Sequence, residues 1–152
     1  MNLKLRSIER REDVGRISAI LETGMEATLR SLGRELPPGT VQRFLDRAWG
    51  RRETLVLVVE GPDGVVGLLA TGPFEDPTTG ETTPMVAAFF VSPSFRHRGI
   101  ARALFAEAQR LLSLRGERRI LARAAHNDDV LISMGERWGL VRAWELMAFE
   151  TS

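Results

Sequence analysis

Residues 85–116 read MVAAFFVSPSFRHRGIARALFAEAQRLLSLRG, and this stretch decides the fold. The seven apolar residues from Met85 to Val91 predict a buried strand, which Ser92-Pro93-Ser94 ends. A helix follows, because apolar side chains recur at helical spacing from Ile100 to Leu112. A basic, glycine-containing turn at 96–99 separates the two. This order can bind a phosphate ester, since the first backbone amides of a helix have no partner within the helix.

The turn carries a short pattern of its own. Gly99 and Ala101 leave room for phosphate oxygens near the main chain, and Arg96 and Arg98 add positive charge. Arg96-x-x-Gly99-x-Ala101 resembles motif A of the GNAT superfamily of N-acetyltransferases, in which such a loop binds the pyrophosphate of acetyl-CoA. The apolar strand before the pattern and the amphipathic helix after it strengthen the resemblance. The alternative is a plain strand–turn–helix unit with solvated arginines.

Length and composition set the class of protein. A chain of 152 residues, 43% hydrophobic and 27% charged, is long enough for one domain with a core and too short for two ordinary ones. The net charge of +1 favours neither nucleic-acid nor membrane binding. The absence of cysteine excludes disulfides and thiolate metal sites, and with two histidines we expect no metal centre. Without a visible signal peptide or membrane span, we expect a cytoplasmic protein.

The rest of the chain predicts further strands and helices, with two helices in a row after the first strand. Expected strands cover 2–8, 54–60, 65–71 and 119–125, and 140–142 with 144–150 is expected to form one last strand or a pair. Expected helices cover 13–33, 40–49 and 128–138. The polar stretch 72–84 is expected to be a loop, either a solvated connector or a substrate-side loop. This order resembles the GNAT fold over the whole chain, 1–152. The resemblance implies an α+β fold, with a mainly antiparallel sheet of six to seven strands, a splayed parallel pair and about four helices.

The resemblance also implies a site for acetyl-CoA in the wedge between the splayed strands. Main-chain groups at the end of the central strand would pair with the pantetheine arm, and amides at 97–102 would hold the pyrophosphate. An asparagine after the next strand often touches the arm, although here it also suits a helix N-cap. The residues implied are Phe89, Phe90, Val91, Arg96, His97, Arg98, Gly99, Ile100, Ala101, Arg102 and Asn127.

At the catalytic positions the chain departs from the family pattern. GNAT enzymes commonly use a tyrosine seven residues after the asparagine as the thiol acid, but position 134 is Met and the chain contains no tyrosine. An amine must lose a proton before it attacks a thioester, so a base or a water chain is required. The candidate bases are Glu81, His126 and Glu145, each of which also suits a solvated surface position.

Two functions follow from the resemblance. The first is an N-acetyltransferase that moves the acetyl group of acetyl-CoA to a primary amine of a small molecule or peptide. The second is a catalytically silent module that binds acyl-CoA, which the missing tyrosine favours. The expected partners are acetyl-CoA and an unidentified amine acceptor, and a homodimer is left open.

Overall fold

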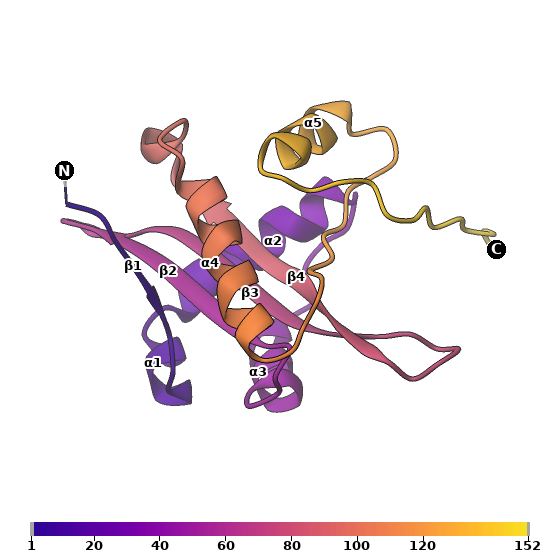
Figure 1. Ribbon diagram of the computed structural model, residues 1–152, viewed down its shortest axis with the longest axis horizontal. Coiled ribbons are helices and arrows are strands. Elements are labelled where there is room, and N and C mark those ends of the chain that lie inside the picture. The colour runs from indigo at the N-terminus through magenta and orange to yellow at the C-terminus, as the bar shows by residue number, and fades with distance from the viewer. Residues whose placement is uncertain (1, 152) are drawn as a thin grey trace.

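The structure is a computed structural model, and it describes residues 2–151. The fold is mixed α+β: three helices follow the first strand, then three strands in succession, then the last two α-helices (Figure 1). In chain order the elements are β1 (Lys4–Ser7), α1 (Arg11–Gly15), α2 (Ser18–Ser31), α3 (Thr40–Ala48), β2 (Leu55–Gly61), β3 (Gly64–Glu75), β4 (Thr82–Val91), the 3-10 turn η1 (Pro93–Phe95), α4 (Ile100–Leu114) and α5 (Asp129–Arg137).

The described residues form one sheet of four strands in the order β1-β2-β3-β4, with every neighbouring pair antiparallel. The expectation of six to seven strands with a parallel pair is therefore wrong for residues 2–151. Residues 119–125 do not form a strand; Leu121 alone makes a parallel bridge, to Met85 of β4. Residues 140–151 contain neither helix nor strand, and Val141 and Leu146 are exposed. Because 119–125 does not form a full strand, residues 140–151 have no strand edge beside them with which to pair.

The helices and the long hairpin also differ from expectation. The expected helix 13–33 is divided into α1 and α2, giving five α-helices among the described residues instead of four. Gly15 has low helix propensity, and the Ile17 amide turns back to the Val14 carbonyl at 3.0 Å, which ends α1. Most of the expected loop at 72–84 is strand, because β3 and β4 stay paired as far out as Glu75 and Thr82. Asp76 closes the remaining tip by accepting hydrogen bonds from the next amides.

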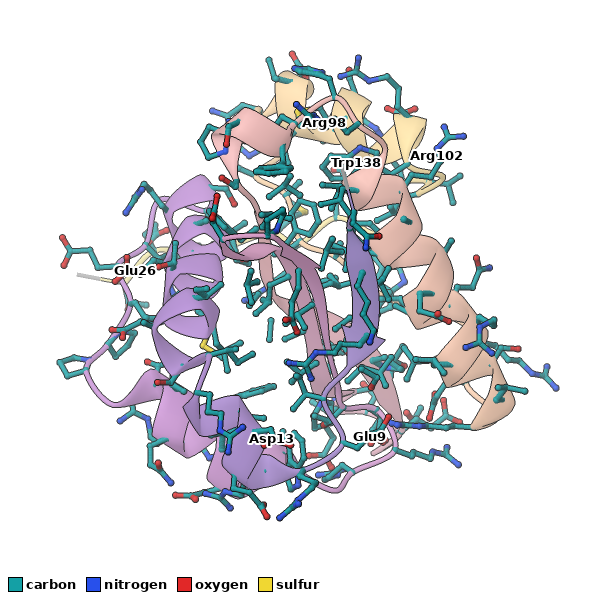
Figure 2. All side chains as sticks on the ribbon, turned by 90° about the vertical axis from the view of Figure 1, so that its left-hand side faces the viewer. Glu9, Asp13, Glu26, Arg98, Arg102 and Trp138 are labelled. Atoms are coloured by element: carbon teal, nitrogen blue, oxygen red, sulfur yellow. The ribbon has the colours of Figure 1, made fainter. Side chains whose placement is uncertain are left out.

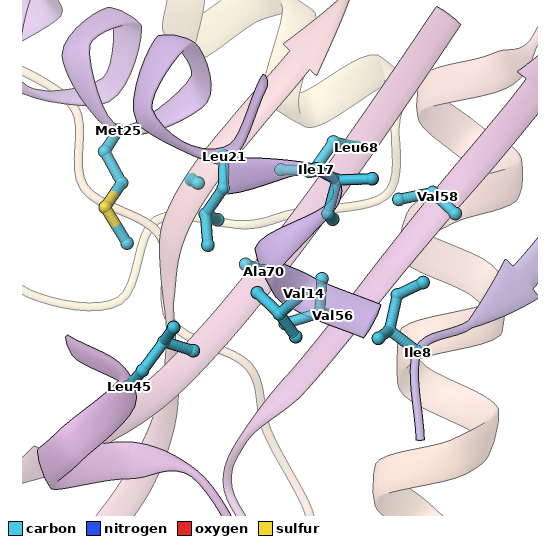
Figure 3. Packing of buried hydrophobic residues seen from close by; sticks show 11 residues of the cluster. Ile8, Val14, Ile17, Leu21, Met25, Leu45, Val56, Val58, Leu68 and Ala70 are labelled. Atoms are coloured by element: carbon cyan, nitrogen blue, oxygen red, sulfur yellow. The ribbon is translucent and has the colours of Figure 1, made fainter. Parts of the chain in front are cut away.

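The core has two parts, one on each face of the sheet. Alternating strand residues such as Val56 and Leu57 point to opposite faces, as the period of a strand requires. α1, α2 and α3 cover one face, where Leu21 and Val14 are fully buried (Figure 3). α4 covers the other face with Ile100, Leu104, Ala108 and Leu112. The sheet thus presents the end of β4 between two helical layers.

One buried carboxylate ties the outer part of β4 to the body. Glu53 is 3% exposed, accepts a hydrogen bond from the Thr82 hydroxyl and lies 3.7 Å from the Arg51 guanidinium. Burial opposes the ionisation of Glu53, but the bonds from Thr82 and its own backbone amide and the charges of Arg51 and Arg52 outweigh it. Together they hold the pKa of Glu53 below its ordinary value.

This lowered pKa makes a prediction about acid stability. The folded state favours the Glu53 carboxylate, so its contribution to the free energy of unfolding is complete above about pH 5. That contribution is lost as the pH falls through the ordinary value toward the lower folded pKa. We expect Glu53→Gln to lower the melting temperature at pH 7 by about 3 to 6 °C, and the deficit to shrink toward pH 3. Thermal unfolding across this range is the measurement, with exposed Glu22 changed to Gln as the control; a deficit that grows in acid would contradict the assignment.

Candidate functional site

The site is built where β4 ends and α4 begins. The Ser92 amide bonds to the Val66 carbonyl at 2.8 Å, which keeps the end of β4 beside β3. The η1 turn then reverses the chain, and Arg96 Nε donates to the Val91 carbonyl at 3.3 Å. His97 and Gly99 both have left-handed backbone angles, with φ of 63° and 78°. These two positions aim the chain into α4.

Unpartnered backbone amides gather at the start of α4. Among residues 2–151, the amides of His97 and of 99–102 donate no hydrogen bond, and the first helical bond runs from Ala103 to the Gly99 carbonyl at 3.0 Å. The first turn of α4 contains no acidic side chain. A Cβ added at Gly99 would meet no atom within 4 Å, so the space before these amides is open. The arrangement is suited to an anion with several oxygens.

The arginines of this region surround the same helix end. The Arg98 guanidinium lies over the Phe95 ring, 5.2 Å from its centroid. Arg102 reaches the end of α5, where its guanidinium donates to the Arg137 carbonyl at 2.5 Å. Figure 2 shows Arg98, Arg102 and Trp138 at one end of the molecule, away from Glu9 and Asp13. The start of α4 is therefore positively charged and lies beside α5.

Close packing fixes α4 against the sheet. A Cβ at Gly67 of β3 would lie 2.9 Å from Ile100 Cγ2 and 3.5 Å from Leu104 Cδ1. Only glycine allows this approach, and it brings the first turn of α4 onto the paired ends of β3 and β4. Any side chain at this position would push the helix and its free amides away from β4.

The outer edge of β4 is paired over only a short length. The Val86 amide bonds to the Leu121 carbonyl, and the Leu121 amide to the Pro84 carbonyl, both at 2.8 Å. The register with β3 then shifts, because Thr71 opposes Val86 whereas Ala70 opposes Ala88. Such a bulge bends and twists the strand. Beyond it, no residue of 122–151 makes a backbone hydrogen bond to β4, so this edge is available for another partner.

Aromatic side chains line the α4 side of that free edge. Phe89 lies 5.5 Å from Phe105 of α4 and 5.2 Å from Trp138, centroid to centroid. Phe105 and Trp138 are stacked at 5.7 Å. These contacts dock the end of α5 beside β4 and α4. The structure therefore brings together the expected cofactor residues of β4, the turn and the first turn of α4.

The other expected residues lie on separate segments. His126 and Asn127 are exposed in the turn before α5, whose N-cap is Asp128, the acceptor from the Leu131 amide at 3.0 Å. Glu81 is exposed at the tip of the β3–β4 hairpin, a full strand length from the turn that follows Val91, and this hairpin projects from the body in Figure 1. Glu145 is exposed in the C-terminal segment. The three candidate bases are not brought together.

Sequence reasoning did not single out Arg123. Its guanidinium is half-buried, and its Nε atom is buried without a hydrogen-bond partner among residues 2–151. Burial lowers the pKa of Arg123, and the nearby charge of Arg34 lowers it further. The available signal was an arginine two residues after Leu121, inside the otherwise apolar run ILARAA.

The fold and this turn agree with a sequence match. The sequence model of the Acetyltransferase (GNAT) family matches residues 21–139. The chain belongs to the GNAT family. The resemblance drawn from Arg96-x-x-Gly99-x-Ala101 and its flanking elements is confirmed, and the protein is an acetyltransferase of this family. No protein in the curated set matches this GNAT chain in sequence.

Solved GNAT structures share the fold at low identity. An aminoglycoside 6'-N-acetyltransferase from Acinetobacter baumannii has a TM-score of 0.70 and 15% identity, with 99% of each chain covered. A predicted acetyltransferase from Clostridium acetobutylicum, solved with acetyl-CoA, has a TM-score of 0.72 and 13% identity over 98% of this chain and 96% of that one. An aminoglycoside acetyltransferase from an uncultured soil sample has a TM-score of 0.70 and 16% identity over 99% and 95%. At these identities the likeness establishes the fold alone.

Metal clusters and membrane-spanning helices are both missing from the described part of the chain. Across 2–151, no three His, Cys, Asp or Glu side chains come together as a group able to hold a metal ion. Within the same residues, no helix has the length and apolar character needed to cross a bilayer.

Proposed function

We propose that this GNAT protein transfers the acetyl group of acetyl-CoA to a primary amine. The observation that carries the proposal is the row of unpartnered amides at His97 and 99–102, open to solvent at the start of α4. A diphosphate needs several donors and a positive field, and this helix end offers both. Solved neighbours that share the fold are bound to acetyl-CoA or CoA, which agrees with the proposal.

With the diphosphate at the start of α4, the other expected cofactor residues can be given roles. Arg96 and Arg98 would neutralise phosphate charge, while Ile100 is buried and contributes its amide alone. The pantetheine arm would lie along the free edge of β4, next to the main chain of 89–91. Asn127 follows residues 122–126, which are not paired with β4. It would contact the pantetheine arm from the side opposite β4.

The chemistry is a direct acyl transfer. The amine nitrogen forms a bond to the thioester carbonyl carbon, the carbon–sulfur bond breaks, and the amine proton leaves while the thiolate accepts one. A backbone amide near the end of β4, such as that of Val91, would stabilise the charge on the carbonyl oxygen. Acetyl-CoA supplies the activated acyl group, and the protein supplies orientation and proton transfer.

The base is proposed among three side chains. His126 shares a turn with Asn127, next to the segment that leaves β4, and we favour it over Glu81 at the hairpin tip and Glu145 in the C-terminal segment. Loss of a general base typically costs 10² to 10⁴ in rate. Single glutamine variants of the three residues would identify it by a fall in kcat of about that size.

The function is tested by release of free thiol from acetyl-CoA. With a panel of primary amines at neutral pH, we expect at least one amine to raise thiol release about tenfold or more over the rate without amine. Mass spectrometry of the product should show one added acetyl group. The reaction without amine is the control for hydrolysis. CoA binding without any amine-dependent thiol release would contradict an enzyme.

That outcome would favour a second function, a module that binds acyl-CoA without turnover. The observation behind it is the absence of tyrosine, with Met134 on α5 where GNAT enzymes commonly carry the thiol acid. Ser133 is the neighbouring hydroxyl, but serine is a weak acid. Both functions require the diphosphate site, so they differ only in chemistry after binding.

A further inference from the structure

Arg123 carries a half-buried charge that the proposed reaction does not use. Its Nε is shielded from solvent and has no hydrogen-bond partner in the described chain. The ion pairs found among residues 2–151 include neither Arg123 nor Arg34. An unpaired charge removed from water is costly unless a counter-ion or hydrogen-bond acceptor is supplied.

A second cation lies beside it. α2 ends at Ser31, and the Arg34 amide turns back to the Leu29 carbonyl at 2.9 Å, which directs the following loop. Figure 1 shows this loop next to the segment that leads from Leu121 to α5. The charge of Arg34 is near enough to lower the pKa of Arg123, so the two guanidinium groups repel each other. An anion bound between them, at the accessible part of each guanidinium, would offset this repulsion.

Even exposed arginines of this fold lie against oxygen atoms of the chain. Arg52 Nε lies 2.7 Å from a carboxylate oxygen of Glu117. Arg115 donates to the carbonyls of Arg52 and Thr54 at 3.1 and 2.9 Å. The chain has 20 acidic residues, yet none is placed against Arg123 or Arg34 in the described structure. The acceptor for this pair is therefore expected from outside the chain.

The pair lies beside the free edge of β4, on the α2 side of the sheet. Arg123 follows Leu121 by two residues, in the part of the segment that has left β4. α2 crosses β4 closely, since a Cβ at Gly24 would lie 3.1 Å from Ala88 Cβ. α4 and its free amides cover the opposite face. A molecule that reaches this edge from the α2 side meets both guanidinium groups.

Resting on the proposed acetyl transfer, we propose that the acceptor is an amine that also carries an anionic group, a carboxylate or a phosphate monoester, bound by Arg123 and Arg34. Guanidinium groups bind both kinds of anion through paired hydrogen bonds. The anion would hold the acceptor while its amine enters the free edge of β4. Amines with several positive charges, such as aminoglycosides, would be repelled from the same position.

Matched pairs of amines test this inference. 4-Aminobutyrate is compared with its carboxamide, and 2-aminoethyl phosphate with ethanolamine, using thiol release with the full chain. We expect kcat/KM to be about tenfold or more higher for the anionic member of one pair, and that pair identifies the anion. An aminoglycoside should be a poorer acceptor than the preferred anionic amine. Arg123→Gln should remove the preference for the anionic amine but retain transfer to the neutral amine. Arg118→Gln, at an exposed position of the same segment, is the control and should keep the preference for the anionic amine.

A stability measurement separates binding from a structural role. Arg123→Met removes an unpaired charge, so the melting temperature of the ligand-free variant should equal or exceed that of the parent. A structural cation would give a lower melting temperature. Arg34→Gln, at an exposed position, gives a second variant that should weaken the anion preference without affecting folding.

The outcomes distinguish this inference from the proposed function. Acetyl transfer to neutral or polycationic amines without preference for anionic ones would uphold the function and overturn the inference. If no amine is acetylated, the proposed function fails, and binding of the anionic amine then tests the inference separately. A rise in melting temperature of the CoA-loaded protein with the anionic amine, lost in Arg123→Gln, would then support the anion site, and no rise would overturn it.

Discussion

Replacing Gly99 with valine should abolish the rise in melting temperature that CoA gives the parent protein. At a CoA concentration about 100 times Kd, binding adds about 2.7 kcal/mol to the free energy of unfolding, or about 5 to 10 °C for a domain of this size. Gly99 has φ of 78° and open space at its Cβ position, directly before the free amides of α4. A branched side chain there would occupy the volume that the diphosphate needs.

The left-handed backbone angle adds a second effect, which needs its own control. A β-branched residue in this conformation costs about 1 to 3 kcal/mol wherever it occurs. Gly116, just after the other end of α4, has φ of 87° and also has no atom within 4 Å of an added Cβ. Gly116→Val should therefore lose similar stability and keep the full response to CoA. An undiminished response in Gly99→Val would show that the diphosphate binds elsewhere.

Replacing Leu104 with alanine should destabilise the protein more than any of the other substitutions. Leu104 is fully buried between α4 and the sheet, and it belongs to the apolar cluster that includes Leu57 and Leu69. Removing it from a packed core costs about 2 to 5 kcal/mol through lost burial and the cavity that remains. Chemical denaturation should show this loss as a lower midpoint with an unchanged slope.

The matched control lies on the same helix. Leu114 is 76% exposed, and its replacement by alanine should change the free energy of unfolding by no more than about 0.5 kcal/mol. Equal effects of the two substitutions would contradict the assignment of the α4 face that contacts the sheet. Leu104 lies beneath the first turns of α4. Leu104→Ala therefore also tests whether packing against the sheet holds the start of α4, where the free amides lie.

The sequence predicted the parts of the fold that depend on local patterns. The central strand and α4 follow directly from the apolar run at 85–91 and the helical spacing after Gly99, and the turn between them supplied the family resemblance. The outer hairpin was missed because pairing between Pro73 and Pro84 depends on register across the strands and not on local composition. Prolines usually indicate a loop, but both lie here in strands.

The missed features of the site depend on contacts distant in sequence. A strand at 119–125 was expected from its apolar residues, but the bulge in β4 near Ala87 and the half-buried Arg123 leave only the bridge at Leu121. The proximity of Arg34 and Arg123 arises from the packing of α2 across β4, which no periodicity reveals. Expected site residues joined by a single turn, by contrast, were placed together because the chain itself connects them.

Hydrogen exchange of backbone amides with and without CoA is the most direct measurement of the diphosphate site. The amides of His97 and 99–102 have no partner within the described chain, and they should exchange rapidly in the free protein. With CoA bound, we predict that these amides become the most strongly protected of the turn and helix, while those around Gly116 do not change. Unchanged exchange at 97–102 in the presence of bound CoA would contradict the account.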